Sequence, residues 1–540
     1  MNTVSFEKLS GSTKLFLDFI QCSDAACKFF KYDFRSVSSY INAAEWIDRC
    51  EYDRPRLVEI IKDNIKQYKL TPQIENNLEK LAKPDSLIVF TGQQVGMLLG
   101  PMYTVIKALS AYKLANVLEE KLNRPVVPCF WMASDDHDFD EVKTVKMLDR
   151  SGEIIESIYE PINNPGGSPM ADVVIDDSID TFISSVNNGL IETEFSNNVK
   201  NIISKHYVKG TTLSNAFAGL FIELMGGYGI IPVDPNFSGM KELFTPVFKN
   251  EIENHEEIFN LYETVSNNII ESGYHRQVHK TKESLNLFLN DGGRSNIIKE
   301  NDHFKLQDSE KSFSKSELLI LLENDPDKFS SNVCLRPIAQ CFAFPTIAQI
   351  VGPSEAAYFA QIGQLFNHFN VPWPVVTPRK FVSIMEPHIK KIFDKLDIDY
   401  ASLYNDTEHE ISRVIKEKFP SEIQSRADSI QTEIDKLLVD LSNELKEYEP
   451  ISYQAMEHSR KKIDHEMNKL SKKLFATHKK RHDTAKGQIE KASAFLFPNG
   501  IFHERVLSPI YFLNKFGPDI IRKIESELDI DSIDHQIVEL

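Results

Sequence analysis

Short apolar runs alternate with amphipathic stretches of helical period between residues 87 and 380. The first unit has an apolar run at 87–90, a glycine-rich loop at 91–101, a helical stretch at 102–122 and a second apolar run at 126–133. Further runs of strand-like length are DVVI at 172–175, IIPVD at 230–234, CLRPI at 334–338 and WPVVTP at 373–378. Strands separated by helices favour βαβ units and a mostly parallel sheet. We therefore predict a doubly wound α/β core.

A period of 3.5 residues replaces this alternation in the region that begins at Glu386. Apolar residues follow steps of four and three at Ile423, Ala427, Ile430, Ile434, Leu437, Leu441 and Leu445. Glu449-Pro450 interrupts this helix, because proline disfavours a helical conformation at the preceding residue. A second seam continues through Ile463, Met467, Leu470 and Leu474. Two helices joined by a short break predict an α-helical antiparallel coiled-coil hairpin, about 40 Å long at 1.5 Å per residue.

These patterns divide the chain into four expected regions. Residues 1–85 form a polar, helical N-terminal segment, and residues 86–385 form the α/β core with its connecting insertions. Within the core, the chain becomes polar at about 281–330, which predicts hairpins or an inserted subdomain outside the main sheet. Residues 386–495 form the coiled coil. Residues 496–540 return to a compact, turn-rich pattern that we expect to pack back on the core.

Composition and charge exclude several classes of partner. The formal net charge of the 540 residues is −18, whereas a general affinity for nucleic acid or anionic membranes needs a basic surface. No apolar run approaches the ~20 residues of a membrane-spanning helix, and residues 1–10 lack a signal-peptide pattern. The six cysteines form no CxxC pair and no zinc spacing. We expect a cytoplasmic protein with no nucleic-acid or membrane partner and no metal site.

The glycine-rich loop follows the first strand of the unit, where ligands bind in doubly wound sheets. Its glycines let backbone N–H groups approach an anion, and the following helix adds partial positive charge. Its candidate substrate-binding residues are Gln93, Gln94, Gly96 and Tyr103. The loop matches neither GxxxxGK[ST] nor GxGxxG, so the standard phosphate fingerprints are absent. Turn formation alone is the alternative explanation of these glycines.

An acidic cluster follows the second strand of the same unit. Its candidate catalytic residues are Asp136, His137, Asp138 and Glu141. A carboxylate can bind a substrate ammonium group and His137 can accept its proton. A divalent-metal site is an alternative, because Mg²⁺ prefers oxygen ligands. Carboxylates in the first turn of a helix also have a structural explanation, since they complement its dipole.

A third group of candidates lies between residues 332 and 358. Arg336 is expected on or beside a strand and is a natural bidentate ligand of a carboxylate or phosphate. A structural ion pair is the alternative. The junction Gly352-Pro353-Ser354-Glu355 begins a helix with free N–H groups and forms a second candidate anion site, with Ser354 as its substrate-binding residue.

The chain lacks the signature motifs of class I aminoacyl-tRNA synthetases. No HxGH occurs in the chain. The stretch KLSKK at 469–473 resembles a KMSKS loop, but Leu470 belongs to the second apolar seam. GxSxG and HExxH are also missing, which removes the commonest hydrolase and zinc-enzyme interpretations.

Several long blocks together resemble the bacillithiol biosynthesis cysteine-adding enzymes, the BshC family. In chain order they are TGQQVGMLLGPMYT, FWMASDDHDFDE, LRPIAQCFAFPTIAQIVGPSEAAYFAQ, the coiled coil over 388–495 and LFPNG…ER…FLNKFG. The resemblance covers the whole chain. It implies a Rossmann-like, mostly parallel core with connecting insertions, distantly similar to class I ligases, and a coiled coil used to form a homodimer.

The resemblance also implies a reaction: a cysteine ligase joins L-cysteine to the amine of glucosaminyl-malate in the last step to bacillithiol. Arg336 or Arg379 is then expected to pair with the malate carboxylates. By analogy with class I ligases, ATP-dependent activation of the cysteine carboxyl group is expected, with ATP or ADP as the nucleotide, although no nucleotide motif identifies it. Two alternatives stay open, namely a metal-dependent hydrolase that uses the acidic cluster and a non-catalytic coiled-coil scaffold whose α/β domain binds a ligand.

Overall fold

The computed structural model describes residues 2–307, 309–417, 421–481 and 483–540. The chain forms two compact units. The first contains Met1–Ile384 and Ile501–Val538 with Leu540, and the second contains Met385–Gly500 with Glu539. Among the described residues, no helix is both long enough and apolar enough to cross a membrane.

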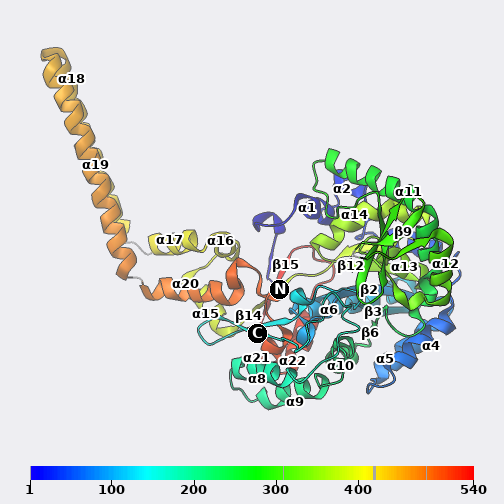
Figure 1. Cartoon of the computed structure of the whole chain (residues 1–540). Helices are drawn as coiled ribbons and strands as arrows, with labels where there is room; N and C mark the ends of the chain where they lie inside the picture. Colours follow the sequence, from blue (N-terminus) through cyan, green and yellow to red (C-terminus); the bar gives the residue numbers. More distant parts are fainter. Residues whose placement is uncertain (1, 308, 418–420, 482) are drawn as a thin grey trace. The chain divides into compact units, whose positions relative to one another are not determined.

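A five-stranded sheet forms the centre of the first unit (Figure 1). Its strand order is β13 (Val375–Pro378), β12 (Thr346–Val351), β2 (Leu87–Gln94), β3 (Val126–Ala133) and β6 (Ile231–Val233). All four pairings are parallel. Helix α6 (Tyr103–Leu122) connects β2 to β3 and packs against both. The predicted Rossmann-like, mostly parallel core is confirmed.

Strand register brings the polar loops of the core to one edge of this sheet. Gln94 at the end of β2 pairs with Ala133 at the end of β3, and Phe90 of β2 pairs with Gln349 near the end of β12. Gly92 permits this close pairing, because a Cβ atom there would lie 2.8 Å from the carbonyl oxygen of Trp131. The loops after β2, β3 and β12 therefore open on a common edge.

Two strand predictions are wrong. The run CLRPI at 334–338 enters helix α13 (Arg336–Ala343). The Asn332 side chain forms a turn before this helix, because it accepts hydrogen bonds from the N–H groups of Cys334 and Leu335. Pro337 then fits the first helical turn. The run DVVI at 172–175 forms only an isolated bridge from Val174 to Thr212. Conversely, β12 lies next to β2 at the centre of the sheet, where the sequence analysis placed no strand.

An antiparallel sheet is inserted between β6 and β12. Its strands, in spatial order, are β10 (Ser312–Ser314), β9 (His303–Leu306), β8 (Arg294–Glu300), β7 (Ser284–Asn290) and β11 (Phe329–Ser331). Helix α11 (Met240–Glu271) packs against β7 and β11. Apart from this inserted sheet, β1 (Asn2–Val4) pairs with β15 (His535–Glu539), so the C-terminal segment shares a sheet with the N-terminus.

The second unit contains a helical hairpin of α18 (Ser421–Tyr448) and α19 (Pro450–Arg481). Ser442 donates to Glu457 over 2.7 Å, Arg460 pairs with Asp435 at 3.1 Å and Gln431 donates to Asp464 over 3.0 Å. Since higher numbers on one helix meet lower numbers on the other, the helices run antiparallel, as predicted.

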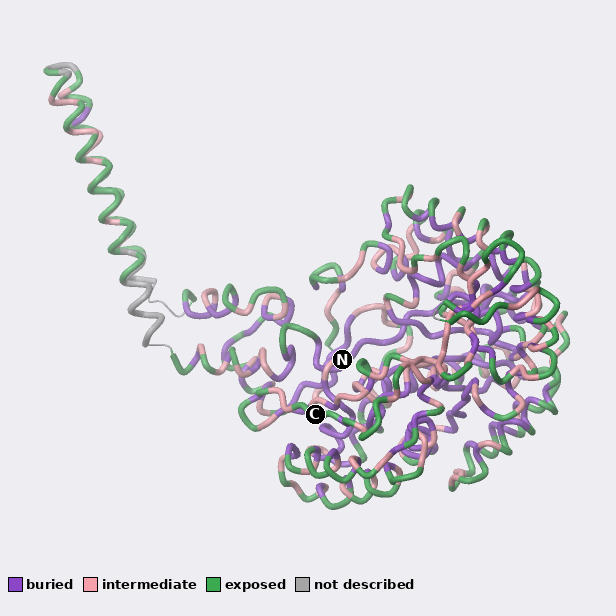
Figure 2. The backbone as a smooth tube through the Cα atoms, in the orientation of Figure 1, coloured by how far each residue is buried: buried purple, intermediate pink, exposed green. Residues whose placement is uncertain are grey.

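Many seam residues of this hairpin are exposed (Figure 2). Leu437 is 64% exposed, Leu441 45% and Leu470 50%. The side chains of Ile423 and Leu474 lie outside the described residues. Part of the apolar seam therefore faces away from the contact between α18 and α19.

Candidate functional site

A cavity of about 830 Å³ opens at the carboxyl edge of the central sheet. The end of β2, the end of β3 with the loop after it, the start of α13, the N-terminus of α14 (Pro353–His368) and the inserted sheet all contribute to its wall. Its volume lies within the range of ~300–1,000 Å³ that is usual for small-molecule sites. All the lining residues belong to the first unit.

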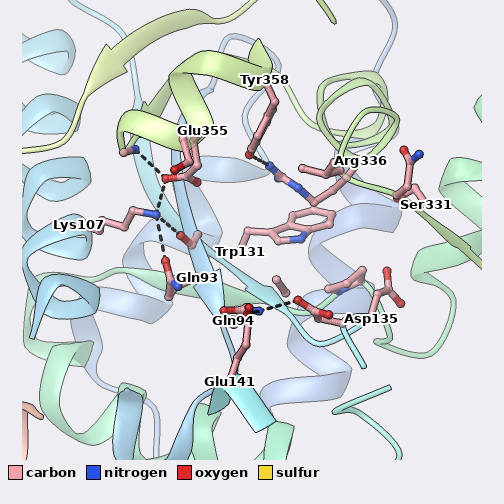
Figure 3. A pocket seen from close by; sticks show the side chains of 18 of the residues that line it. Gln93, Gln94, Lys107, Trp131, Asp135, Glu141, Ser331, Arg336, Glu355 and Tyr358 are labelled. Atoms are coloured by element: carbon pink, nitrogen blue, oxygen red, sulfur yellow. Dashed lines mark hydrogen bonds and ion pairs between the residues drawn. The ribbon is translucent and has the colours of Figure 1, made fainter. Parts of the chain in front are cut away.

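Lys107 organises one side of the cavity (Figure 3). Its Nζ lies 2.5 Å from Glu355 Oε2 and donates to the Gly92 carbonyl at 2.8 Å and to Gln93 Oε1 at 3.1 Å. Gln93 donates in turn to the Tyr103 hydroxyl at 3.1 Å. Burial lowers the pKa of Lys107, while Glu355 opposes this effect. The lysine thus connects the end of β2 to the start of α14.

Gln94 brings two of the predicted catalytic carboxylates together. Its Nε2 donates to Asp136 Oδ2 at 2.7 Å and to Glu141 Oε2 at 2.8 Å. Both carboxylates line the cavity, as do Gln93, Gln94 and Tyr103. The shared amide donor holds both carboxylates side by side on the cavity wall.

His137 and Asp138, the other two predicted catalytic residues, are not among the residues that line this cavity. Asp138 is the N-cap of the short helix α7 (Phe139–Val142), and its Oδ1 accepts from the Glu141 N–H at 3.3 Å. His137 Nδ1 accepts a hydrogen bond from Arg294 Nη1 at 3.1 Å. The structure therefore separates the cluster into two carboxylates that line the cavity and two neighbours that do not.

Asp135 lines the cavity, although the sequence analysis did not select it. It forms an ion pair with Lys241 at 2.6 Å, and the Lys241 side chain is only 1% exposed. The preceding residue, Ser134, donates to buried Asp234, whose pKa burial raises to about 6. Lys241 and Asp234 lie about a hundred residues away in the chain, so no local sequence pattern connects them with this loop.

The two predicted arginines differ in how their charges are compensated. Arg336 Nη1 donates to Gln340 Oε1 at 3.0 Å and Nη2 to the Tyr358 hydroxyl at 2.8 Å. Within the described part of the chain, no carboxylate forms an ion pair with Arg336. Arg379 instead pairs with buried Glu504 at 2.7 Å. Both line the cavity, but of these two arginines Arg336 is the one without a carboxylate partner among the described residues.

The remaining candidate substrate-binding residues, Ser354 and Gly96, line two different cavities. Ser354 lines the main cavity at the first turn of α14, beside Gly352. Gly96 lines a second cavity of about 410 Å³, next to the glycine-rich loop. Arg505, which the sequence analysis did not identify, lines both cavities, as do Gln94 and Glu141. Gly96 is therefore placed beside the main cavity rather than on its wall.

The inserted antiparallel sheet supplies residues that sequence reasoning missed. Phe288 of β7, Arg294 of β8 and Ser331 of β11 all line the main cavity. Their stretch of sequence is polar and carries no recognisable motif. Among the described residues, no three or more His, Cys, Asp or Glu side chains gather in a group suited to a metal ion.

The fold and cavity together define a class of protein. A parallel sheet with insertions carries, at its carboxyl edge, a cavity lined by paired carboxylates and an uncompensated guanidinium, as in α/β proteins that bind charged small molecules. The chain belongs to the BshC family. Residues 1–380 match the family model for "Bacillithiol biosynthesis BshC, N-terminal Rossmann-like domain" and residues 382–540 match that for "Bacillithiol biosynthesis BshC, C-terminal coiled-coil domain".

Individual relatives agree with this assignment over nearly their whole length. The chain is 30% identical to a protein of Salinibacter ruber, with 97% of this chain and 96% of the relative covered. It is 28% identical to a protein of Prosthecochloris aestuarii, with 98% and 96% covered. Both relatives carry the name "Putative cysteine ligase BshC". The resemblance seen in the sequence is confirmed, and the hydrolase and scaffold alternatives are not favoured.

Proposed function

We propose that this protein is a cysteine ligase that joins L-cysteine to the amine of glucosaminyl-malate, the last step of bacillithiol biosynthesis. One observation carries the proposal: in a chain that matches the BshC family throughout, Asp136 and Glu141 share the Gln94 amide in a cavity that also exposes Arg336. Such a cavity suits a substrate that carries both an ammonium group and carboxylates.

The carboxylates account for the handling of the amine. Amide formation needs a free amine lone pair that attacks the carboxyl carbon of an activated cysteine, with loss of one proton from nitrogen and departure of the leaving group from carbon. Asp136 and Glu141 bind the ammonium form. One carboxylate accepts the proton that frees the amine lone pair, and the other accepts the proton that nitrogen loses when the amide forms. Gln94 keeps the two carboxylates at fixed positions through hydrogen bonds of 2.7 and 2.8 Å.

The other predicted residues take binding and supporting roles. Arg336 pairs with a substrate carboxylate, since Gln340 and Tyr358 orient its guanidinium without neutralising it. Gln93, Tyr103 and Ser354 provide polar contacts on the cavity wall. Arg379, which the sequence analysis also proposed for the malate group, contributes less charge because Glu504 compensates it.

ATP is the expected activator of the cysteine carboxyl group. Two features of the cavity wall favour a polyphosphate, namely exposed Arg505 and the first turn of α14 at Ser354. The Gly352 N–H is already used, because it donates to Glu355 Oε2 at 2.7 Å. When bound, the nucleotide supplies a leaving group for the carboxyl carbon. The residues of this chain orient the carboxyl group, hold the amine and remove its proton.

A homodimer through the hairpin belongs to the same proposal. Leu437, Leu441 and Leu470 are at least 45% exposed, and a second copy of the hairpin can cover such a heptad surface. The proposed compartment is the cytoplasm, where the substrate cysteine is kept as a free thiol.

Thiol profiling of cells that lack this protein tests the proposed function. We expect bacillithiol to disappear and glucosaminyl-malate to accumulate. Both should return to wild-type levels when the wild-type gene is restored. Purified protein should also melt at a higher temperature in the presence of glucosaminyl-malate, because a ligand that binds the folded state stabilises it. Normal bacillithiol in the deletion strain would refute the proposal.

A further inference from the structure

Arg294 reaches the cavity from the inserted sheet and is held by groups from three parts of the fold. Its Nε donates to Ser330 Oγ at 2.9 Å, its Nη2 to the Ser331 carbonyl at 3.0 Å and its Nη1 to His137 Nδ1 at 3.1 Å. The guanidinium also stacks on Phe288, 3.8 Å from the ring centroid. These contacts fix both the position and the plane of the cation.

The charge of Arg294 is not compensated by an ion pair among the described residues. Asp135 and Asp136 lie close enough to favour the charged form, but Asp135 is paired with Lys241 and Asp136 accepts from Gln94. Burial nevertheless lowers the pKa of Arg294. A guanidinium has five N–H donors, of which the three contacts use three, so two donors are left for a ligand. A partly buried cation without an ion-pair partner gains from an anionic ligand.

The contact with Arg294 also determines the state of His137. A guanidinium can only donate, so His137 Nδ1 must carry a lone pair and the neutral ring must hold its proton on Nε2. Arg294 lines the cavity whereas His137 does not. His137 therefore acts on the substrate through Arg294, as a positioning residue.

We infer that Arg294, positioned by His137, binds a malate carboxylate of glucosaminyl-malate. This inference rests on the proposed function. In that substrate the amine and the malyl group occupy adjacent carbons of the sugar ring. A cation beside the amine-binding carboxylates matches this spacing, and Arg294 and Asp136 are both in reach of His137, whose Nδ1 lies 3.1 Å from the first and 4.0 Å from the second.

Binding of two ligands to the full-length protein tests the assignment. The probes are glucosaminyl-malate and methyl glucosaminide, which keeps the amine but lacks the malyl group. Loss of a charged hydrogen bond predicts that Arg294→Met weakens glucosaminyl-malate binding about 10- to 100-fold and leaves methyl glucosaminide binding within about twofold. Arg522→Met, at an arginine whose side chain is 80% exposed, is the matched control and should change neither.

Variants of His137 separate positioning from a general structural role. His137→Ala should raise the KM for glucosaminyl-malate about tenfold with kcat changed much less, because it acts on binding through Arg294. His137→Asn should restore the KM, since its amide oxygen can accept the same hydrogen bond. A fall in kcat at unchanged KM in both variants would instead make His137 an acid–base group and overturn the positioning role.

The possible failures are distinct from one another. If wild-type protein does not bind glucosaminyl-malate, the proposed function fails together with this inference. If wild-type protein binds it and folded Arg294→Met binds it equally well, only the Arg294 assignment fails. If Arg294→Met loses ATP binding and keeps glucosaminyl-malate binding, the anion at Arg294 is a phosphate and the malate assignment is overturned.

Discussion

The cavity edge of the central sheet and the hairpin of α18 and α19 differ in whether their side chains have partners within the chain. At the cavity edge, charged groups find partners within the chain, as Lys107 does with Glu355 and Asp135 with Lys241. In the hairpin, apolar groups such as Leu437 are exposed. The charged groups named at the cavity edge therefore draw their partners from the same chain, whereas the hairpin keeps an apolar surface that the proposed dimer would cover.

The difference shows how far each kind of interaction depends on tertiary structure. The ion pair of Asp135 joins residues more than a hundred positions apart, so its loss affects a site built from several elements. The hairpin contacts repeat along two consecutive helices. Substitutions at the cavity edge should therefore have larger and less local effects than substitutions in the hairpin.

Glu141→Gln should have the largest effect on activity. It removes a proton acceptor from the cavity while keeping the shape of the side chain, and the loss of general base catalysis predicts a fall in kcat of about 10²- to 10⁴-fold. The rate of bacillithiol formation by the purified protein measures this fall in kcat. Glu153→Gln, at an exposed glutamate in the next loop, is the control. Activity within threefold of wild type would remove Glu141 from the reaction.

Lys107→Met should strongly destabilise the first unit. It leaves Glu355 without its cation at a site where the lysine side chain is 4% and the glutamate 21% exposed. Removal of one partner of such a pair costs about 3 kcal/mol, at the lower end of the range for buried pairs because Glu355 is partly exposed. Tryptophan fluorescence during denaturation reports on this unit, which contains all three tryptophans.

Two further variants sharpen this measurement. Lys121→Met changes an exposed lysine of the same helix and should leave the free energy of unfolding nearly unchanged. Lys107→Met combined with Glu355→Gln should recover part of the loss, because no unpaired charge is left. An equal loss in the single and double variants would show that the ion pair does not matter.

Asp234→Asn should change how stability depends on pH. The pKa of Asp234 is about 6 in the folded protein, above its ordinary value of 3.8, so the folded state holds the proton more tightly. Its contribution is fully present below pH 3.8 and is lost as pH rises through 6, by about 3 kcal/mol for two pKa units. The variant should lack this loss between pH 4 and 7. Identical pH profiles would contradict the raised pKa.

Leu437→Asp should weaken the proposed dimer about 10- to 100-fold, since it places a charge on an apolar surface without disturbing the cavity. Sedimentation velocity at micromolar concentration measures the change. Asn443→Asp introduces the same single charge at an exposed polar position of α18 and should leave the dimer intact. A wild-type monomer at these concentrations would show that the hairpin surface does not self-associate.

Asp138→Ala should have the smallest effect. It removes the N-cap of α7, which predicts a loss of about 1 kcal/mol in the free energy of unfolding, while Asp138→Ser should keep most of the stability. Activity should fall only modestly, in contrast to Glu141→Gln. A loss of kcat as large as that of Glu141→Gln, in a folded protein, would restore Asp138 to the catalytic set.

Local patterns in the sequence determined much of this protein. Apolar runs at 87–90 and 126–133 with a helix between them predicted the first parallel pair, and the 3.5-residue period predicted the hairpin and its break at Pro450. The acidic cluster and glycine loop were correctly expected at one sheet edge, because parallel strands end there together. These features depend on neighbours in sequence, so a pattern can reveal them.

Tertiary structure alone decided which charged groups the cavity can use. Glu504 neutralises Arg379, whereas no such partner reaches Arg336 within the described residues. The inserted sheet brings Arg294 to His137, which lies 157 positions away in the chain. Electrostatic interactions depend on distance in space and on burial, and neither can be read from sequence spacing. The sequence therefore pointed to this edge of the sheet, and the fold determined which charged groups line its cavity.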